Sequence, residues 1–217
     1  MKKLVIFDLD GTLLNTIEDL GAACNYALKE EGYPEHPMSS YQFMVGNGVR
    51  TLMQRALVDA DEKTVDRLLE NFKRYYDCHN CEHTVPYKGI PELLASLREQ
   101  GVAVAVASNK YQSAVEKIIP HYFPGIEFAA LEGQREGRQC KPDPSIVFSI
   151  LNRVPTPKSE VLYVGDSGVD METARRACVE SVGVTWGYRP VSELRSSGAN
   201  YIESKPLSIL ERLGDPF

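Results

Sequence analysis

Two aspartates with one residue between them, Asp8 and Asp10, follow a short apolar run near the start of the chain. At the end of a strand, carboxylates with this spacing can point in different directions, so that one attacks phosphorus while the other handles protons. Other polar side chains follow later apolar runs or precede a predicted helix, namely Ser108, Asn109, Lys110, Lys141, Asp166 and Asp170. The pattern predicts a polar site to which several distant segments contribute.

Four aspartates, namely Asp8, Asp10, Asp166 and Asp170, would repel one another strongly if they shared one crevice. A cation must therefore lie among them, and hard oxygen ligands in this number favour Mg²⁺, which keeps several waters and bridges phosphate groups. Lys141 adds another positive charge. A phosphate-monoester dianion would then be balanced by the metal, by Lys141 and by hydrogen-bond donors from Ser108, Thr12 and the backbone.

The elements that position these residues are visible as apolar runs. The run Leu4–Phe7 ends in acidic residues and glycine, which is typical of a buried parallel strand. Similar runs predict strands over residues 102–107, 161–164 and 182–185, with a weaker candidate over 128–131. Patterns between them predict helices over residues 90–100, 111–119, 144–152 and 168–178. The alternation predicts an α/β fold with a doubly wound, parallel, Rossmann-like sheet, whose ligands bind at the carboxyl ends of the strands.

One long segment interrupts the alternation. Residues 15–83 show helical patterns and no strand, so we predict a small helical cap domain inserted after the first strand of a core formed by residues 1–14 and 84–217. The helical patterns cover residues 16–32, 49–59 and 62–77. Thr16, with Asp19 three residues later, predicts a capping box at the start of the first of these helices.

These motifs together resemble a known family. Phe7-Asp8-Leu9-Asp10-Gly11-Thr12 resembles the first motif of the haloacid dehalogenase-like superfamily. Ser108 matches its second motif, Lys141 its third, and Gly165-Asp166-Ser167-Gly168-Val169-Asp170 its fourth. The four motifs stand in the right order and span nearly the whole chain, and the helical segment is similar to the type-1 cap of the family.

The resemblance implies a role for each matching aspartate. Asp8 is expected to be the nucleophile that forms an aspartyl-phosphate, and also a metal ligand. Asp10 is expected to be the acid/base and to reach the Mg²⁺ cofactor through its backbone carbonyl. Asp166 is expected to bind the metal directly, while Asp170 supports it or binds through water.

The resemblance also suggests how substrate is held. Ser108 and Lys141 are expected to orient the phosphate. Residues 13–16, 45–48 and 108–110 are most similar to the phosphoglycolate phosphatase subgroup, in which threonine usually stands where this chain has Ser108, so the hydroxyl is kept. Further substrate contacts are expected from Thr12, Asn109, Lys110, Gly46, Asn47 and Arg50.

The amino-acid composition indicates which kinds of binding partner and which compartment to expect. The net charge of −6 and the isoelectric point near 5.3 argue against nucleic acid and leave a small phosphorylated metabolite as the expected ligand. Five scattered cysteines favour a reducing compartment. The apolar run after Lys2 and Lys3 is too short for a signal peptide, and no stretch approaches the ~20 apolar residues of a membrane span. We therefore expect a soluble, cytoplasmic protein without a membrane partner, either a monomer or a homodimer.

Several other functions are compatible with parts of the pattern. Pyrophosphate, nucleotides and sugar phosphates remain alternative substrates. A phosphosugar mutase of the same superfamily typically has Glu-Asp in its fourth motif, whereas this chain has Gly165-Asp166. A dehalogenase needs no proton donor at Asp10, and receiver domains lack a helical insert of this length. The segment Cys78-His79-Asn80-Cys81-Glu82-His83 interleaves its histidines with its cysteines, unlike the usual zinc pattern, and we interpret it as a helix end.

Overall fold

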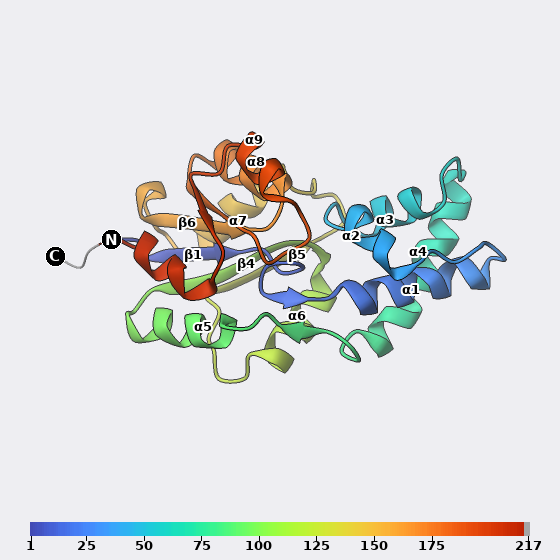
Figure 1. The fold of residues 1–217 in the computed structure, drawn as a ribbon, viewed down its shortest axis with the longest axis horizontal. Helices are drawn as coiled ribbons and strands as arrows, with labels where there is room; N and C mark the ends of the chain where they lie inside the picture. Colours follow the sequence, from blue (N-terminus) through green and yellow to red (C-terminus); the bar gives the residue numbers. More distant parts are fainter. Residues whose placement is uncertain (215–217) are drawn as a thin grey trace.

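The computed structural model describes residues 1–214, and in this part of the chain six parallel strands form one sheet in the order β5-β4-β1-β6-β7-β8 (Figure 1). Its strands are β1 (Leu4–Phe7), β4 (Ala103–Tyr111), β5 (Ala130–Gln134), β6 (Val161–Gly165), β7 (Glu180–Val184) and β8 (Tyr201–Glu203). The predicted parallel α/β sheet is confirmed. β1 lies inside it, between β4 and β6.

Burial on both faces explains the continuous apolar run of β1. Successive strand residues point to opposite faces of a sheet. Val5 and Phe7 pack in one hydrophobic cluster and Leu4 and Ile6 in another, and all four side chains are fully buried. A strand whose two faces are both covered needs apolar residues at every position, which is why no alternation with polar residues is seen.

Helices cover both faces of the sheet (Figure 1). One face packs against α5 (Ile90–Glu99), α6 (Gln112–Tyr122) and the 3-10 helix η3 (Pro206–Arg212). The other face packs against α7 (Ser145–Arg153) and α8 (Gly168–Ala177). The short elements η2 (Lys158–Glu160) and α9 (Val191–Ser196) precede β6 and β8. The predicted helices of the core therefore exist, with ends shifted by a few residues.

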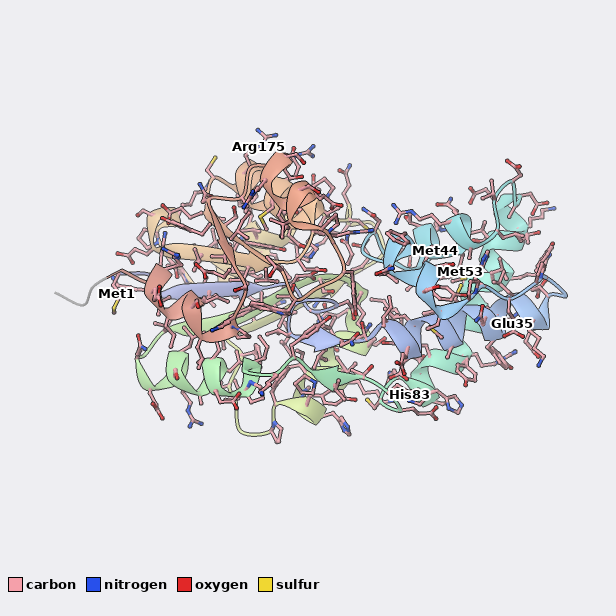
Figure 2. The ribbon with its side chains drawn as sticks, in the orientation of Figure 1. Met1, Glu35, Met44, Met53, His83 and Arg175 are labelled. Atoms are coloured by element: carbon pink, nitrogen blue, oxygen red, sulfur yellow. The ribbon has the colours of Figure 1, made fainter. Side chains whose placement is uncertain are left out.

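A group of helices lies beyond the carboxyl ends of the strands, on the right of Figure 1. It contains α1 (Ile17–Glu30), η1 (Met38–Ser40), α2 (Tyr41–Met44), α3 (Val49–Ala56) and α4 (Glu62–His79). These helices bury their own apolar cluster, to which Met53 belongs (Figure 2). The chain reaches them through β2 (Leu14–Asn15) and returns through β3 (Val85–Pro86), and these two strands pair antiparallel. The division at residues 15 and 83 stays a prediction, and this paired connection supports it.

The predicted capping box at Thr16 is wrong. Thr16 makes no side-chain cap, because its hydroxyl instead donates to Asp10 Oδ1 at 2.7 Å. The Asp19 carboxylate accepts from the backbone N–H groups of His83 and Thr84, at 2.9 Å each. Tertiary partners therefore replace the local cap, and they tie α1 to the segment that returns to the core.

Two features of the strands differ from expectation. β4 continues to Tyr111, so Ser108 lies in the strand and cannot be the N-cap of the helix that follows. β8 has three residues, two of them only half-buried, and this is too short to produce a recognisable apolar run. Within residues 1–214, no helix combines the length and the apolar character that crossing a membrane requires.

Candidate active site

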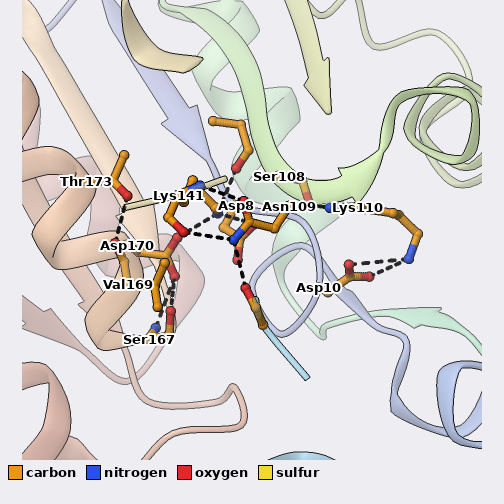
Figure 3. Close-up of polar contacts among 12 residues, drawn as sticks. Asp8, Asp10, Ser108, Asn109, Lys110, Lys141, Ser167, Val169, Asp170 and Thr173 are labelled. Carbon is orange, nitrogen blue, oxygen red and sulfur yellow. Dashed lines mark hydrogen bonds and ion pairs between the residues drawn. The ribbon is translucent and has the colours of Figure 1, made fainter. Parts of the chain in front are cut away.

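Most of the predicted site residues of the core lie together at the carboxyl ends of β1, β4 and β6 (Figure 3). Asp8 and Asp10 follow β1, Ser108 lies near the end of β4, and Asp166 follows β6. The loop before α7 carries Lys141 into the same place, where it contacts Asp8 directly. Neighbouring parallel strands end at one edge of the sheet, so residues more than a hundred positions apart meet there.

Lys141 is the central cation of the site. Its Nζ lies 2.8 Å from Asp8 Oδ1, 2.8 Å from Asp170 Oδ1 and 2.9 Å from the carbonyl oxygen of Ala107. Burial alone would lower the pKa of Lys141, but the carboxylates of Asp170 and Asp8 outweigh it and raise that pKa well above its usual value. The ammonium is therefore permanently charged and held in position by three acceptors.

Three buried carboxylates surround this one ammonium. Oxygen atoms of Asp8, Asp166 and Asp170 lie within 4.8 Å of one another. Burial, reinforced by the neighbouring Asp170, raises the pKa of Asp8 to about 7. Burial and the carboxylates of Asp170 and Asp8 raise the pKa of Asp166 well above its usual value. One lysine cannot balance three ionised carboxylates, so this hard-oxygen group fits a divalent cation such as Mg²⁺.

Glycines make room for the Asp166 carboxylate. Gly11, with φ of +88°, passes so close to Asp166 that a Cβ atom would overlap the carboxylate, and the same holds for Gly187. The backbone N–H of Tyr188 donates to Asp166 Oδ2 at 2.7 Å. Gly11 is therefore required both for its left-handed backbone and for its missing side chain.

Asp170 is held by the start of α8. The backbone N–H and the hydroxyl of Ser167 donate to its Oδ2 at 3.1 and 2.6 Å, which forms a capping box (Figure 3). Its Oδ1 contacts Lys141. Both oxygens thus have fixed partners, and the expected support of the metal by Asp170 stays a prediction.

Asp10 is oriented separately from the three-carboxylate group. Its Oδ1 accepts from the Thr16 hydroxyl at 2.7 Å and from Lys110 Nζ at 2.9 Å. Lys110 Nζ in turn lies 4.7 Å from the centre of the Tyr76 ring. Lys110 was predicted to contact substrate, and in the structure its ammonium is paired with Asp10 (Figure 3).

Asn109 joins two loops to the end of β4. Its Oδ1 accepts from the backbone N–H of Lys141 at 2.8 Å, and its Nδ2 donates to the carbonyl of Gly46 at 3.0 Å. These contacts connect the core to the helical segment, and the predicted contact of Asn109 with substrate stays a prediction. Ser108, which is buried, accepts from the backbone N–H of Lys110 at 3.1 Å.

A small cavity of about 40 Å³ separates the core from the helical segment at this point. From the core it is lined by Asp8, Asp10, Ser108, Asn109, Lys110 and Tyr111, and from the helical segment by Leu20, Val45, Gly46, Gly48, Val49, Leu52 and Tyr76. Gly46 is thus the one member of the predicted helical-segment contacts that lines it. Thr12 lies outside this lining, although its buried hydroxyl has no hydrogen-bond partner among residues 1–214.

Asn47 and Arg50 lie apart from the catalytic carboxylates. Asn47 Oδ1 accepts from Arg55 at 2.8 Å, and Arg50 pairs with Glu62 and Asp66 of α4. Both residues line a neighbouring groove of about 530 Å³. Direct contact of either residue with substrate stays a prediction.

Three residues escaped the sequence analysis. Tyr188 donates its backbone N–H to Asp166, and Arg189 Nη2 donates to the Val45 carbonyl of the helical segment at 2.9 Å. Both lie in the loop that follows β7, so their position beyond the carboxyl end of a predicted strand was an available signal. Tyr76 belongs to α4, and no sequence pattern relates it to the site.

Three of the histidines and cysteines at the end of α4 and just after it have local partners. His79 Nδ1 lies 2.6 Å from Glu82 Oε1, and Cys81 Sγ contacts Asn80 Oδ1 at 3.2 Å. His83 lies at the lower edge of the helical group in Figure 2, with more than half of its side chain exposed. This arrangement agrees with the interpretation of the segment as a helix end.

Mg²⁺ should raise the unfolding temperature more at pH 8 than at pH 5. Because burial raises the folded-state pKa of Asp8 to about 7, the metal-free protein loses stability as the pH rises through that value. At pH 5 a proton already occupies the carboxyl, and the cation must displace it. With Mg²⁺ at about 100 times its Kd, the gain at pH 8 should be about 2.7 kcal/mol. Thermal melts would measure the shift, with NaCl at matched ionic strength as control; equal shifts at both pH values would contradict it.

The chain is similar to known proteins in both sequence and structure. Residues 5–184 match the model of the haloacid dehalogenase-like hydrolase family. A phosphoglycolate phosphatase of Pseudomonas syringae pv. tomato is 36% identical over 202 residues, covering 89% of this chain and 74% of that protein. A phosphoglycolate phosphatase of Aquifex aeolicus is 30% identical, covering 96% of this chain and 95% of that protein. A crystal structure from Lactobacillus delbrueckii subsp. bulgaricus superposes with a TM-score of 0.92 at 32% identity, with both chains covered in full.

Proposed function

Because the chain belongs to the haloacid dehalogenase-like hydrolase family and is a phosphoric monoester hydrolase, we propose that it hydrolyses a small phosphorylated metabolite similar to phosphoglycolate through an aspartyl-phosphate on Asp8. The observation that carries the proposal is the buried contact between Asp8 and Lys141, beside the cavity. A carboxylate next to a fixed ammonium can receive a phosphoryl group without leaving its negative charge unbalanced.

The proposed reaction has two steps. In the first, an Asp8 oxygen bonds to phosphorus, the bond from phosphorus to the leaving oxygen breaks, and Asp10 gives that oxygen a proton. In the second, a water oxygen bonds to phosphorus, Asp10 takes a proton from that water, and the bond between phosphorus and Asp8 breaks. Inorganic phosphate then leaves, and Asp8 is free again. Thr16 and Lys110 hold the Asp10 carboxylate, and Lys141 and Ser108 orient the phosphoryl oxygens.

Asp8 and Asp166 would hold the metal through their carboxylates and Asp10 through its backbone carbonyl, with Asp170 in support. Bound there, Mg²⁺ would neutralise the carboxylates and draw charge from the phosphoryl oxygens. The surplus of negative charge in the unliganded cluster supports this assignment, because a dianionic substrate would otherwise meet mostly carboxylates.

The size of the cavity favours a small leaving group. A water molecule needs about 10 to 15 Å³ of such volume, so about 40 Å³ admits only a few non-hydrogen atoms. Glycolate, with five non-hydrogen atoms, is nearer to this limit than a nucleoside or a hexose.

A nucleotide or pyrophosphate phosphatase is the second candidate. The groove of about 530 Å³ adjoins the cavity, and the two share Gly48, Val49, Asn109 and Tyr111. Lys73 from α4 and Arg135 from the core both line it. If the helical segment shifts, a larger anionic leaving group would extend into this groove.

Phosphate release from a substrate panel tests the proposal. The purified protein is assayed with phosphoglycolate, ethyl phosphate, pyrophosphate, a nucleoside monophosphate and glucose 6-phosphate, with Mg²⁺ or with EDTA. We expect the highest kcat/KM for phosphoglycolate, loss of release with EDTA and recovery when Mg²⁺ is added in excess.

Each alternative predicts a different outcome. A preference for pyrophosphate or the nucleotide would favour the second candidate. Conversion of glucose 6-phosphate to an isomer without phosphate release would identify a mutase. Release that persists in EDTA would contradict the metal assignment, and no release from any compound would contradict the proposed substrate class.

A further inference from the structure

The loop after β7 lies against two parts of the active site. Trp186 Nε1 donates to the carbonyl of Thr12 at 3.0 Å, and the backbone N–H of Tyr188 donates to Asp166 Oδ2 at 2.7 Å. This loop lies beyond residues 5–184, which match the family model, and outside the four motifs of the sequence. Its contacts therefore come from the tertiary structure alone.

The side chain of Tyr188 reaches the point where the chain leaves the core for the helical segment. Its hydroxyl accepts from the backbone N–H of Thr16 at 2.9 Å and lies 3.2 Å from Thr16 Oγ1. Its ring packs against the apolar cluster of the helical segment, which fixes the direction of the hydroxyl. One residue thus contacts the metal-binding group through its backbone and Thr16 through its side chain.

The number of available hydrogens gives the direction of the contact between the two hydroxyls. Thr16 has one hydroxyl hydrogen, and it is donated to Asp10 Oδ1 at 2.7 Å, because an ionised carboxylate can only accept. Thr16 Oγ1 therefore accepts from Tyr188. The phenol hydrogen has a second acceptor within reach, Asn15 Oδ1 at 3.4 Å, and the contact with Thr16 is the shorter of the two. The hydrogen bonds thus run from Tyr188 through Thr16 to Asp10.

This chain of hydrogen bonds acts on one oxygen of Asp10. Oδ1 accepts from Thr16 and from Lys110 Nζ at 2.9 Å, whereas Oδ2 has only a contact of 3.3 Å with Lys110. Oδ2 is thus the oxygen that is free to carry a transferable proton. Asp10 lines the cavity beside Asp8, so the hold on Oδ1 sets where that proton meets the leaving oxygen.

We infer that Tyr188 is a positioning residue for Asp10, acting through the Thr16 hydroxyl. The inference rests on the proposed function, in which Asp10 gives a proton to the leaving oxygen, and it adds a residue that no motif identifies. Each hydrogen bond in such a chain polarises the next, so the phenol also strengthens the bond from Thr16 to the carboxylate.

Two small phosphates distinguish proton donation from the rest of catalysis. Phosphoglycolate loses an alcohol, whose oxygen must gain a proton as its bond to phosphorus breaks. Acetyl phosphate loses acetate, a weak base that leaves without a proton. The value of kcat/KM covers the steps up to the departure of the leaving group, so it reports Asp10 as an acid and excludes its later work on water.

The first variant is Tyr188→Phe. We expect its kcat/KM for phosphoglycolate to fall about 5- to 30-fold, the effect of one lost hydrogen bond at the acid. The value for acetyl phosphate, corrected with an enzyme-free blank, should change less than about 3-fold. The Mg²⁺ concentration that gives half of the maximal rate should stay the same, because phenylalanine keeps the backbone N–H that contacts Asp166.

A double-mutant cycle tests the path through Thr16. Thr16→Val should show the same selective loss on phosphoglycolate, and adding Tyr188→Phe to it should cause no further loss, because the phenol then has no hydroxyl to act through. Tyr122→Phe is the matched control. Its hydroxyl donates to the carbonyl of Thr84 at 2.8 Å and does not line the cavity, so its removal should change both phosphates by the same factor.

Several results would overturn the inference. Equal losses on the two phosphates in Tyr188→Phe would assign the hydroxyl a structural role. A raised Mg²⁺ requirement would place its effect at Asp166. Losses that add in the double variant would show that Tyr188 does not act through Thr16, and an unchanged value for phosphoglycolate would show that it does not act on Asp10 at all.

Asp10→Asn identifies a failure of the proposed function separately. This variant should lose activity on phosphoglycolate on the order of 100-fold or more and much less on acetyl phosphate. Equal losses in Asp10→Asn would contradict the acid step of the proposed function, and the inference would fall with it. A selective loss in Asp10→Asn without one in Tyr188→Phe would overturn the inference alone.

Discussion

An Asp8→Asn variant should release phosphate on the order of 10⁴-fold more slowly than the wild type, because an amide cannot form the phosphoenzyme. The variant should nevertheless unfold at the same temperature or higher at pH 8. Burial and the nearby Asp170 raise the pKa of Asp8 to about 7, so its ionised form destabilises the fold above that pH. Asparagine removes the charge and keeps the shape. Steady-state phosphate release and thermal melts without metal would measure both effects.

The stability gain should depend on pH. At pH 5 most Asp8 carboxyls carry a proton in the folded state, so the difference in unfolding temperature between Asp8→Asn and the wild type should shrink. Glu92→Gln, an exposed carboxylate-to-amide change in α5, is the matched control and should alter neither property. A rate for Asp8→Asn within tenfold of the wild type would mean that another group is the nucleophile.

Lys141→Met should reduce both stability and activity. Methionine leaves Asp8 and Asp170 buried without the ammonium that contacts both at 2.8 Å. Removing one partner of a buried ion pair typically costs about 3 to 5 kcal/mol of unfolding free energy. We also expect kcat/KM to fall on the order of 10³-fold, because the phosphoryl oxygens lose a fixed positive charge. Urea titrations and phosphate release would be measured in parallel.

Mg²⁺ should distinguish the loss of stability from the loss of activity in Lys141→Met. Saturating Mg²⁺ should restore part of the stability of Lys141→Met, since it neutralises the same carboxylates, but it should not restore activity. Lowering the pH to 5 should also reduce the loss of stability, because Asp8 then carries its own proton. Lys29→Met, an exposed lysine of α1, is the control. Full activity in a variant that has lost stability would show that Lys141 serves the fold alone.

The sequence by itself determined the architecture of the core and the identity of the charged residues. A run such as Leu4–Phe7, short and ended by acidic residues and glycine, predicts a strand buried on both faces, because a strand with both faces covered needs apolar residues at every position. The parallel sheet then requires that strand ends share one edge. Asp8, Lys141 and Asp166 were therefore expected together without any knowledge of their distances.

Only the tertiary structure decided which groups pair. Thr16 was expected to cap its own helix, but it binds Asp10, and Lys110 reaches the same carboxylate from a strand a hundred residues later. Such partners depend on loop paths and side-chain directions, which a local sequence pattern does not specify. The short β8 and the contact of Arg189 with the helical segment escaped prediction for the same reason.

Tyr76 shows this limit most clearly. In the sequence it is one more apolar-facing position of an amphipathic helix, and its packing on Phe72 is what the helical period predicts. Only the structure shows that it also lies at the cavity that α4 forms jointly with the ends of β1 and β4. The period of a helix specifies which residues face inward, but the elements packed against that face decide what chemistry they meet there.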